Sequence, residues 1–157
     1  MSLVNIAFAL AFAFTGQASA AKKPERSAAV GDLLVTVTRV WLPRVSGRKL
    51  QLFESGRFHL VAVEIAVKNV STRISNTSVV PSLKVKPDME YHAQVGVARE
   101  VGISSPNFYQ LLPGEESRGG YVFVVRNGAT PVNLNLFSNF KTSSIELAGL
   151  VETESAR

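Results

Sequence analysis

Hydrophobic residues alternate with smaller or polar ones along the stretch 58–69. The large branched residues at every second position are Val61, Val63, Ile65 and Val67. A period of two is typical of a strand with one buried face, because successive side chains point to opposite sides of a sheet. In a helix the same spacing would spread these residues around the axis, and β-branched side chains pack well on a sheet. At about 1.5–3 kcal/mol for each fully buried large apolar side chain, the stretch is predicted to be the central strand of the core.

Weaker alternation predicts further strands before and after this one. They cover residues 33–41, 78–86, 89–95, 121–126, 132–136 and 145–151. In the first of them the apolar residues switch from one face of the strand to the other near Arg39, which predicts a bulge or a twist. Pro81 cannot donate a hydrogen bond to a neighbouring strand, so the strand 78–86 is expected at a sheet edge.

Three segments lack this alternation and are expected to be loops or turns. They are 42–56, 96–112 and 112–120, the last being a turn-rich approach to the strand 121–126. No stretch has the pattern of an amphipathic helix of useful length. Many short strands separated by turn signals predict an all-β fold in which two antiparallel sheets pack as a sandwich. A closed barrel is the alternative that this pattern leaves open.

The N-terminal residues have the pattern of a cleavable secretory signal peptide. Residues 1–21 carry no charged side chain, 6–14 are apolar, and Ala18-Ser19-Ala20 has the small-x-small form of a cleavage site. The apolar run is shorter than the ~20 residues that span a bilayer, so an uncleaved anchor is the less favoured alternative. We expect a signal peptide at 1–20, a flexible leader at 21–29, the sandwich at 30–151 and a polar tail at 152–157, in a periplasmic or extracellular protein.

The composition gives the chain a net positive charge and leaves no cysteine for a disulfide. The chain has 157 residues, no cysteine and a formal net charge of +5, so packing alone must stabilise the domain, and neither a disulfide nor a lipid-modified cysteine is expected. A basic balance favours acidic partners. Arginine and lysine lie close to aromatic residues in the loop 42–56, and this loop and 96–112 are the candidate binding loops. The predicted partner-binding residues are Trp41, Arg44, Arg48, Lys49 and Phe53.

The histidines do not form a metal-binding pattern. His59 and His92 are the only two, they fall on different predicted strands, and a zinc site needs three or four ligands. Asp88 and Glu90 alternate with His92 on one side of a strand pair, which allows at most a weak accidental site. We expect both histidines at the rim of the sandwich and no cofactor or metal.

Two serine-x-x-lysine spacings occur, at Ser46/Lys49 and Ser138/Lys141. This spacing brings an amine to a hydroxyl on a helix, and neither pair lies in a predicted helix, so neither is expected to form a catalytic pair. The phosphate-binding, nucleophile-elbow and zinc-protease motifs do not occur. No catalytic residue is therefore assigned, and we expect a protein that is not an enzyme.

Four features in chain order are similar to those of a known family. They are Val30-Gly31-Asp32 ahead of 33–37, the valine-rich strand closed by Lys68-Asn69-Val70, the hairpin at 83–91, and Leu112-Pro113-Gly114-Glu115 ahead of Tyr121-Val122-Phe123. Over about residues 30–137 the chain resembles the telokin-like family of secreted bacterial immunoglobulin-fold proteins. The resemblance implies an immunoglobulin-like β-sandwich, exported or surface-attached, with no catalytic motif. Many members are anchored through a lipidated cysteine, which this chain lacks.

These observations favour an exported, non-enzymatic binding or interaction module of the bacterial cell envelope or the extracellular space. Its expected partner is another protein or an anionic envelope component. Nucleic acid is not expected, nor is a transmembrane anchor after signal cleavage. The alternatives are a basic adhesion domain for anionic surfaces and a metal-dependent enzyme built on loops.

Overall fold

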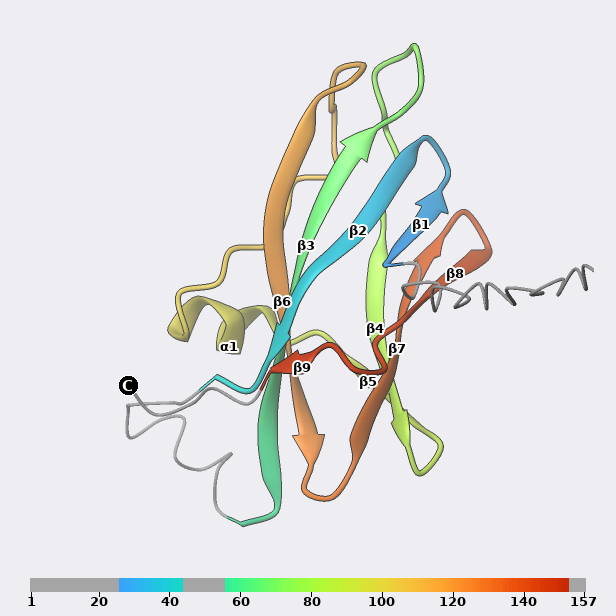
Figure 1. The fold of residues 1–157 in the computed structure, drawn as a ribbon. Helices are drawn as coiled ribbons and strands as arrows, with labels where there is room; N and C mark the ends of the chain where they lie inside the picture. Colours follow the sequence, from blue (N-terminus) through green and yellow to red (C-terminus); the bar gives the residue numbers. More distant parts are fainter. Residues whose placement is uncertain (1–25, 44–55, 153–157) are drawn as a thin grey trace, which may run out of the picture.

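Two β-sheets lie face to face in the protein (Figure 1). The computed structural model describes residues 26–43 and 56–152. The first sheet has the order β1 (Ser27–Val30), β2 (Leu33–Trp41), β3 (Phe58–Asn69), β6 (Glu116–Arg126), and β9 (Val151–Glu152) also pairs with β2. The second has the order β5 (Met89–His92), β4 (Val80–Lys86), β7 (Thr130–Ser138), β8 (Lys141–Glu146). Apart from β2 and β9, which are parallel, the paired strands are antiparallel, and the predicted β-sandwich is confirmed.

The valine-rich strand is β3, and it lies between β2 and β6, which agrees with its predicted central place in the core. The four branched side chains of its inner face, Val61, Val63, Ile65 and Val67, are 0% exposed. They belong to one buried cluster that includes residues of both sheets. The outer face of β3 is also partly covered: Leu60 and Ala62 are buried beneath α1 (Val95–Glu100), in a second small cluster with Ala98 and Val122. Helix α1 therefore removes from solvent a part of the face that strand alternation predicts to be wet.

The predicted bulge in β2 is confirmed at Thr38. Val37 faces Ile65 of β3 and Arg39 faces Glu64, so Thr38 has no partner of its own in the register. Because of this extra residue, Val37 and Val40 both enter the core although they are three positions apart. Arg39 and Trp41 consequently share the outer face.

Both predicted ends of the sandwich need correction. Residues 27–29 of the expected flexible leader belong to β1, which pairs with β2 around a tight turn at Gly31. Gly31 has φ +59, a conformation that favours glycine. At the other end, Glu152 of the expected polar tail belongs to β9 and faces Trp41. In both places short strands without strong alternation complete an edge of the first sheet.

Three internal predictions are also wrong. Strand β4 is not an edge strand: it lies between β5 and β7, and Pro81 is tolerated because pairing with β5 begins one residue later, at Ser82. Helix α1 begins at Val95, the last residue of the expected strand 89–95, and continues into the expected loop 96–112. With six residues it is too short to show a periodic pattern. Strand β6 begins at Glu116 instead of at 121.

None of the helices in 26–43 and 56–152 has the length and apolar character to cross a bilayer.

Candidate functional site

Of the five residues predicted to bind a partner, Trp41 lies in the described part of the chain. The other four, Arg44, Arg48, Lys49 and Phe53, fall within 44–55, outside the described residues. Trp41 is the last residue of β2, opposite Ala62 of β3. Its ring packs against the cluster beneath α1 and is half-buried, so part of the indole remains at the surface.

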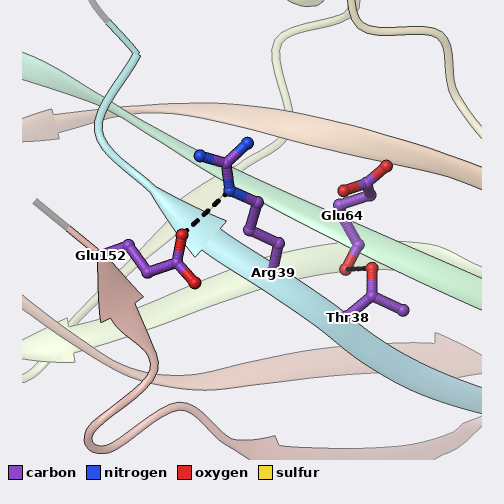
Figure 2. A network of polar contacts seen from close by, with 4 residues as sticks. All are labelled: Thr38, Arg39, Glu64 and Glu152. Atoms are coloured by element: carbon purple, nitrogen blue, oxygen red, sulfur yellow. Dashed lines mark hydrogen bonds and ion pairs between the residues drawn. The ribbon is translucent and has the colours of Figure 1, made fainter. Parts of the chain in front are cut away.

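Arg39 extends over this ring. Its guanidinium carbon lies 4.7 Å from the centroid of the Trp41 ring, within the range of a cation–π contact. Its Nε donates to Glu152 Oε2 over 3.1 Å, as Figure 2 shows. On the other side of β2, Thr38 Oγ1 donates to the Glu64 carbonyl over 3.1 Å (Figure 2). None of the ion pairs between described residues involves the exposed Glu64 carboxylate.

The segment after α1 forms a wall beside these residues. It runs along the free edge of β6, where Gly120 N donates to Ser104 O over 2.8 Å. Ahead of α1, Gln94 N donates to Val122 O of the same strand, also over 2.8 Å. A Cβ at Gly119 would lie 2.4 Å from Pro106 N and 2.5 Å from Ser104 O. The two backbones approach too closely for any side chain, so glycine at 119 fixes the position of this wall.

Between the wall and the first sheet lies a solvent-open groove of about 440 Å³. Its lining residues are Arg39, Trp41, Glu64, 101–104 and Arg118-Gly119-Gly120. Arg118 Nε donates to Glu116 Oε1 over 2.8 Å, so exposed carboxylates neutralise both arginines of the groove. The side chains of Arg39 and Glu152 are 42% and 62% exposed, and a solvent-screened pair of this kind is weak enough for an incoming anion to replace.

Part of this groove is not predicted from the sequence. Gly119-Gly120 lies within β6, and a glycine inside a strand is a signal for a close backbone approach, whereas the sequence predicts a turn at these positions. Glu152 carries no such signal, because its contact with Arg39 is made between strands at opposite ends of the chain.

The two histidines lie in different sheets, His59 in β3 and His92 in β5. His59 Nδ1 lies 3.0 Å from Asn127 Oδ1, a contact beside the β6–β7 turn. Over the described residues, no group of three or more His, Asp or Glu side chains is placed to hold a metal ion.

Ser138 and Lys141, which have the serine-x-x-lysine spacing, lie at the β7–β8 turn. A two-residue turn places them directly opposite each other, as the closing pair of the β7–β8 hairpin. No hydrogen bond joins them, and the buried Ser138 Oγ has no partner among the described residues. Ser46 and Lys49 lie outside the described part of the chain.

A second polar cluster lies on the outer face of the other sheet. Its side chains come from four neighbouring strands: Ser144 Oγ donates to Asn135 Oδ1 over 2.9 Å, and Asn135 Nδ2 donates to Glu90 Oε1 over 3.2 Å. Ser82 Oγ donates to the same carboxylate oxygen. The hydrogen bonds from Ser82 and Asn135 lower the pKa of the Glu90 carboxyl below its usual 4.5. This cluster binds the four strands to one another across their solvent face.

Tyr121 also has a shifted pKa, for a structural reason. Burial raises the pKa of its hydroxyl above the usual 10.0. Its ring is stacked on Phe108, with centroids 6.4 Å apart and planes 12° apart. The neutral phenol is thus a part of the core and not of the groove.

Comparison with known proteins bears on the fold alone. No protein-family model matches the chain, and a search among curated proteins finds no match. Among solved structures the chain is similar to a conserved hypothetical protein from Bacillus anthracis, with a TM-score of 0.51 and 20% sequence identity over 80% of this chain and 100% of that one. It also matches an uncharacterized β-sandwich protein from Clostridium difficile, with a TM-score of 0.44 and 10% identity over 80% and 91% of the two chains. The protein is a β-sandwich whose likeness to the Bacillus anthracis structure is one of fold.

Proposed function

We propose that the protein is an exported, non-enzymatic binding module that holds a segment of another protein in the groove beside Trp41. The observation that carries this proposal is the stacking of Arg39 on Trp41 at the border of a solvent-open groove. Tryptophan and arginine are the residues most often found as energetic anchors of protein interfaces. The Glu64 carboxylate beside them adds a group for a basic or hydrogen-bonding side chain of the partner.

The fold supports a finer assignment, which we include in the proposal: membership in the telokin-like immunoglobulin-fold family. The chain passes from β3 in one sheet to β4 in the other, β6 returns to pair with β3, and β7 pairs with β4. Such crossing between two antiparallel sheets is typical of immunoglobulin-type sandwiches. Export through the signal peptide at 1–20 places the module in the periplasm or outside the cell.

The groove is suited to a partner of mixed charge. A carboxylate of the partner can replace Glu152 at Arg39 with two parallel hydrogen bonds, because the guanidinium presents several donors in one plane. The Trp41 ring provides apolar contact area, and the backbone of 101–104 provides the opposite wall. Each of these groups is already in place before the partner binds, so little conformational entropy is lost on binding.

Photo-crosslinking tests the proposal in the native envelope. A photoreactive phenylalanine analogue replaces Ser104, which lines the groove, or Ser144, which is also an exposed serine but lies on the outer face of the other sheet. The expected result is a discrete protein adduct at Ser104 that is absent at Ser144 and is reduced by Trp41→Ala. Identical adducts at the two positions, or none at Ser104, would contradict the proposal.

The second candidate, charge-driven adhesion to anionic surfaces, is supported by the basic composition. Eleven of the 17 basic residues and nine of the 12 acidic residues lie in 26–43 and 56–152, so most of the positive excess belongs to the other segments. Adhesion of this kind therefore depends chiefly on Lys22, Lys23 and the basic residues of 44–55. Retention on a sulfated polymer that weakens as salt rises supports it, and retention that ignores salt excludes it.

A further inference from the structure

One end of the sandwich collects most of the exposed hydrophobic side chains. Nine large hydrophobic residues are exposed in the described ranges. Besides Leu34, which is 37% exposed at the start of β2, seven of them lie at the end where β3 and β7 finish and β4, β6 and β8 begin. These seven, which we call the apolar end, are Val70, Ile74, Val80, Tyr109, Leu112, Phe137 and Phe140. Singly scattered apolar residues are ordinary on a surface, but a concentration at one place marks an interaction site.

The two loops that carry four of these residues, the 70–79 loop and the loop ahead of β6, are tied together. Ser75 and Leu111 form an isolated bridge, and Asn69 Nδ2 donates to the Leu111 carbonyl over 2.8 Å. In Figure 1 the 70–79 loop and the loop ahead of β6 reach the top of the molecule side by side. Val80 and Phe137 are cross-strand partners and continue the same surface towards the β7–β8 turn.

The β7–β8 turn gives an independent reason to assign this end a function. Asn139 and Phe140 have φ 48 and φ 62, so both lie in the left-handed region that a two-residue hairpin turn requires. Glycine suits the second position best, and a bulky residue there is strained. The Phe140 side chain is 97% exposed and so gains no burial within the monomer. Phenylalanine at this position strains the backbone and buries no apolar surface in return. This indicates that its side chain contacts another molecule.

The shape and charge of the apolar end favour a lipid bilayer over a preformed protein pocket. Five of its seven apolar residues lie in loops or turns, and the other two, Val80 and Phe137, lie at the ends of neighbouring strands. A bilayer can deform around such projections. Two tips pair an apolar residue with an exposed basic neighbour, Arg73-Ile74 and Phe140-Lys141. A basic group next to an inserted apolar side chain can reach the lipid phosphates. The nearby Glu115 carboxylate is occupied by the Leu112 N–H, at 2.7 Å.

We propose that the apolar end inserts Phe140, Ile74 and Leu112 into the interfacial region of a lipid bilayer. The inference goes beyond the groove beside Trp41, which is built from other residues, so the two sites can be occupied at the same time. Insertion is hydrophobic in origin and differs in this respect from adhesion through the net charge.

The test is partition of the exported protein onto vesicles of phosphatidylcholine, with and without phosphatidylglycerol. Phe140→Gly is the most informative variant, because it removes the inserted side chain while relieving the backbone strain. We expect its partition coefficient to fall by about tenfold, with thermal stability unchanged or higher. Ile74→Ser is expected to weaken partition in the same direction. The matched control is Val95→Ser, which alters an apolar residue of α1 that is 62% exposed and lies away from the apolar end.

A local readout identifies which part of the chain enters the bilayer. In the Trp41→Phe background, Phe140→Trp provides a single tryptophan at the turn. Its emission is expected to shift to the blue on vesicles and to be quenched by brominated lipids, at high as well as low salt. The proposal is overturned if this emission does not change, if wild-type binding is lost at high salt, or if Phe140→Gly and Val95→Ser partition like the wild type. It is equally overturned if sedimentation shows that the apolar end instead joins two copies of the chain.

Discussion

Glu152 and Arg39 are 113 positions apart in the chain, yet Glu152 Oε2 lies 3.1 Å from Arg39 Nε. The contact joins β9 to β2 near the end of β2, beside Trp41. It is a solvent-exposed pair, so its net contribution to folding is about 0–1 kcal/mol. Its importance lies instead in holding the guanidinium at the border of the groove.

Replacement of Glu152 separates these two roles. For Glu152→Gln we expect a change in the free energy of unfolding of less than about 1 kcal/mol, measured by urea denaturation. The affinity for a carboxylate-bearing partner is expected to rise, because Arg39 no longer exchanges an internal partner for an external one. A large loss of stability with no change in affinity would show that the pair is structural.

Gly119 is predicted to be intolerant of any side chain. Gly119→Ala places a methyl group against the backbone of Ser104 and Pro106, so we expect a loss of about 1–3 kcal/mol of stability and displacement of the wall. The control is Gly96→Ala in α1, where no atom lies within 4 Å of the added Cβ. That variant is expected to be neutral or to gain up to about 1 kcal/mol from helix propensity. Thermal unfolding distinguishes the two, and equal melting temperatures would contradict the geometry of the wall.

The core strand sets the scale of the packing energy. Ile65 is 0% exposed in β3, and Ile65→Ala is expected to cost about 2–5 kcal/mol, whereas Ile65→Val costs about 0.5–1.5 kcal/mol. Val95→Ala, on the surface, is expected within about 0.5 kcal/mol of the wild type. Chemical denaturation of the three variants provides the comparison. A cost for Ile65→Ala no larger than that for Val95→Ala would place β3 outside the core.

Glu90 is predicted to make stability depend on acid pH. Its hydrogen bonds to Ser82 and Asn135 lower the pKa in the folded protein, so the carboxylate favours folding above its unfolded pKa. This contribution is lost as the pH falls through the lower, folded pKa. Glu90→Gln is therefore expected to be less stable than the wild type at neutral pH, and the difference should shrink as the solution is acidified below about pH 4. A difference that stays constant from neutral to acid pH would assign the effect to packing.

The sequence contains enough information for the main features of the fold. Alternation alone identifies β3, and the shift of apolar parity from Val37 to Val40 locates the bulge in β2, because a buried face is a strong constraint on register. Helix α1 escapes prediction because six residues make too few turns for a period to be visible. Pro81 misleads because its missing donor excludes pairing on one side of one residue only, not along the whole of β4.

The candidate site is less accessible to such reasoning. Trp41 is identified by its residue type and its basic surroundings. The groups around it, Glu152 and the wall at 101–104, are not identified in this way, because contacts between segments distant in the sequence bring them beside Trp41. Burial of Leu60 and Ala62 beneath α1 is similarly invisible in an alternating pattern. Local patterns determine strands, whereas the groove results from the way in which the strands are assembled.

The most direct test of the central claim is the dissociation constant of the partner captured at Ser104, measured with wild-type protein and with Trp41→Ala. Trp41→Phe serves as the conservative variant, and Tyr109→Ala, at the apolar end, as the control for an exposed aromatic residue. The account predicts a loss of at least about tenfold in affinity for Trp41→Ala, as expected for an interface anchor. It predicts partial retention for Trp41→Phe and no change for Tyr109→Ala. Equal affinity of the wild type and Trp41→Ala would contradict it.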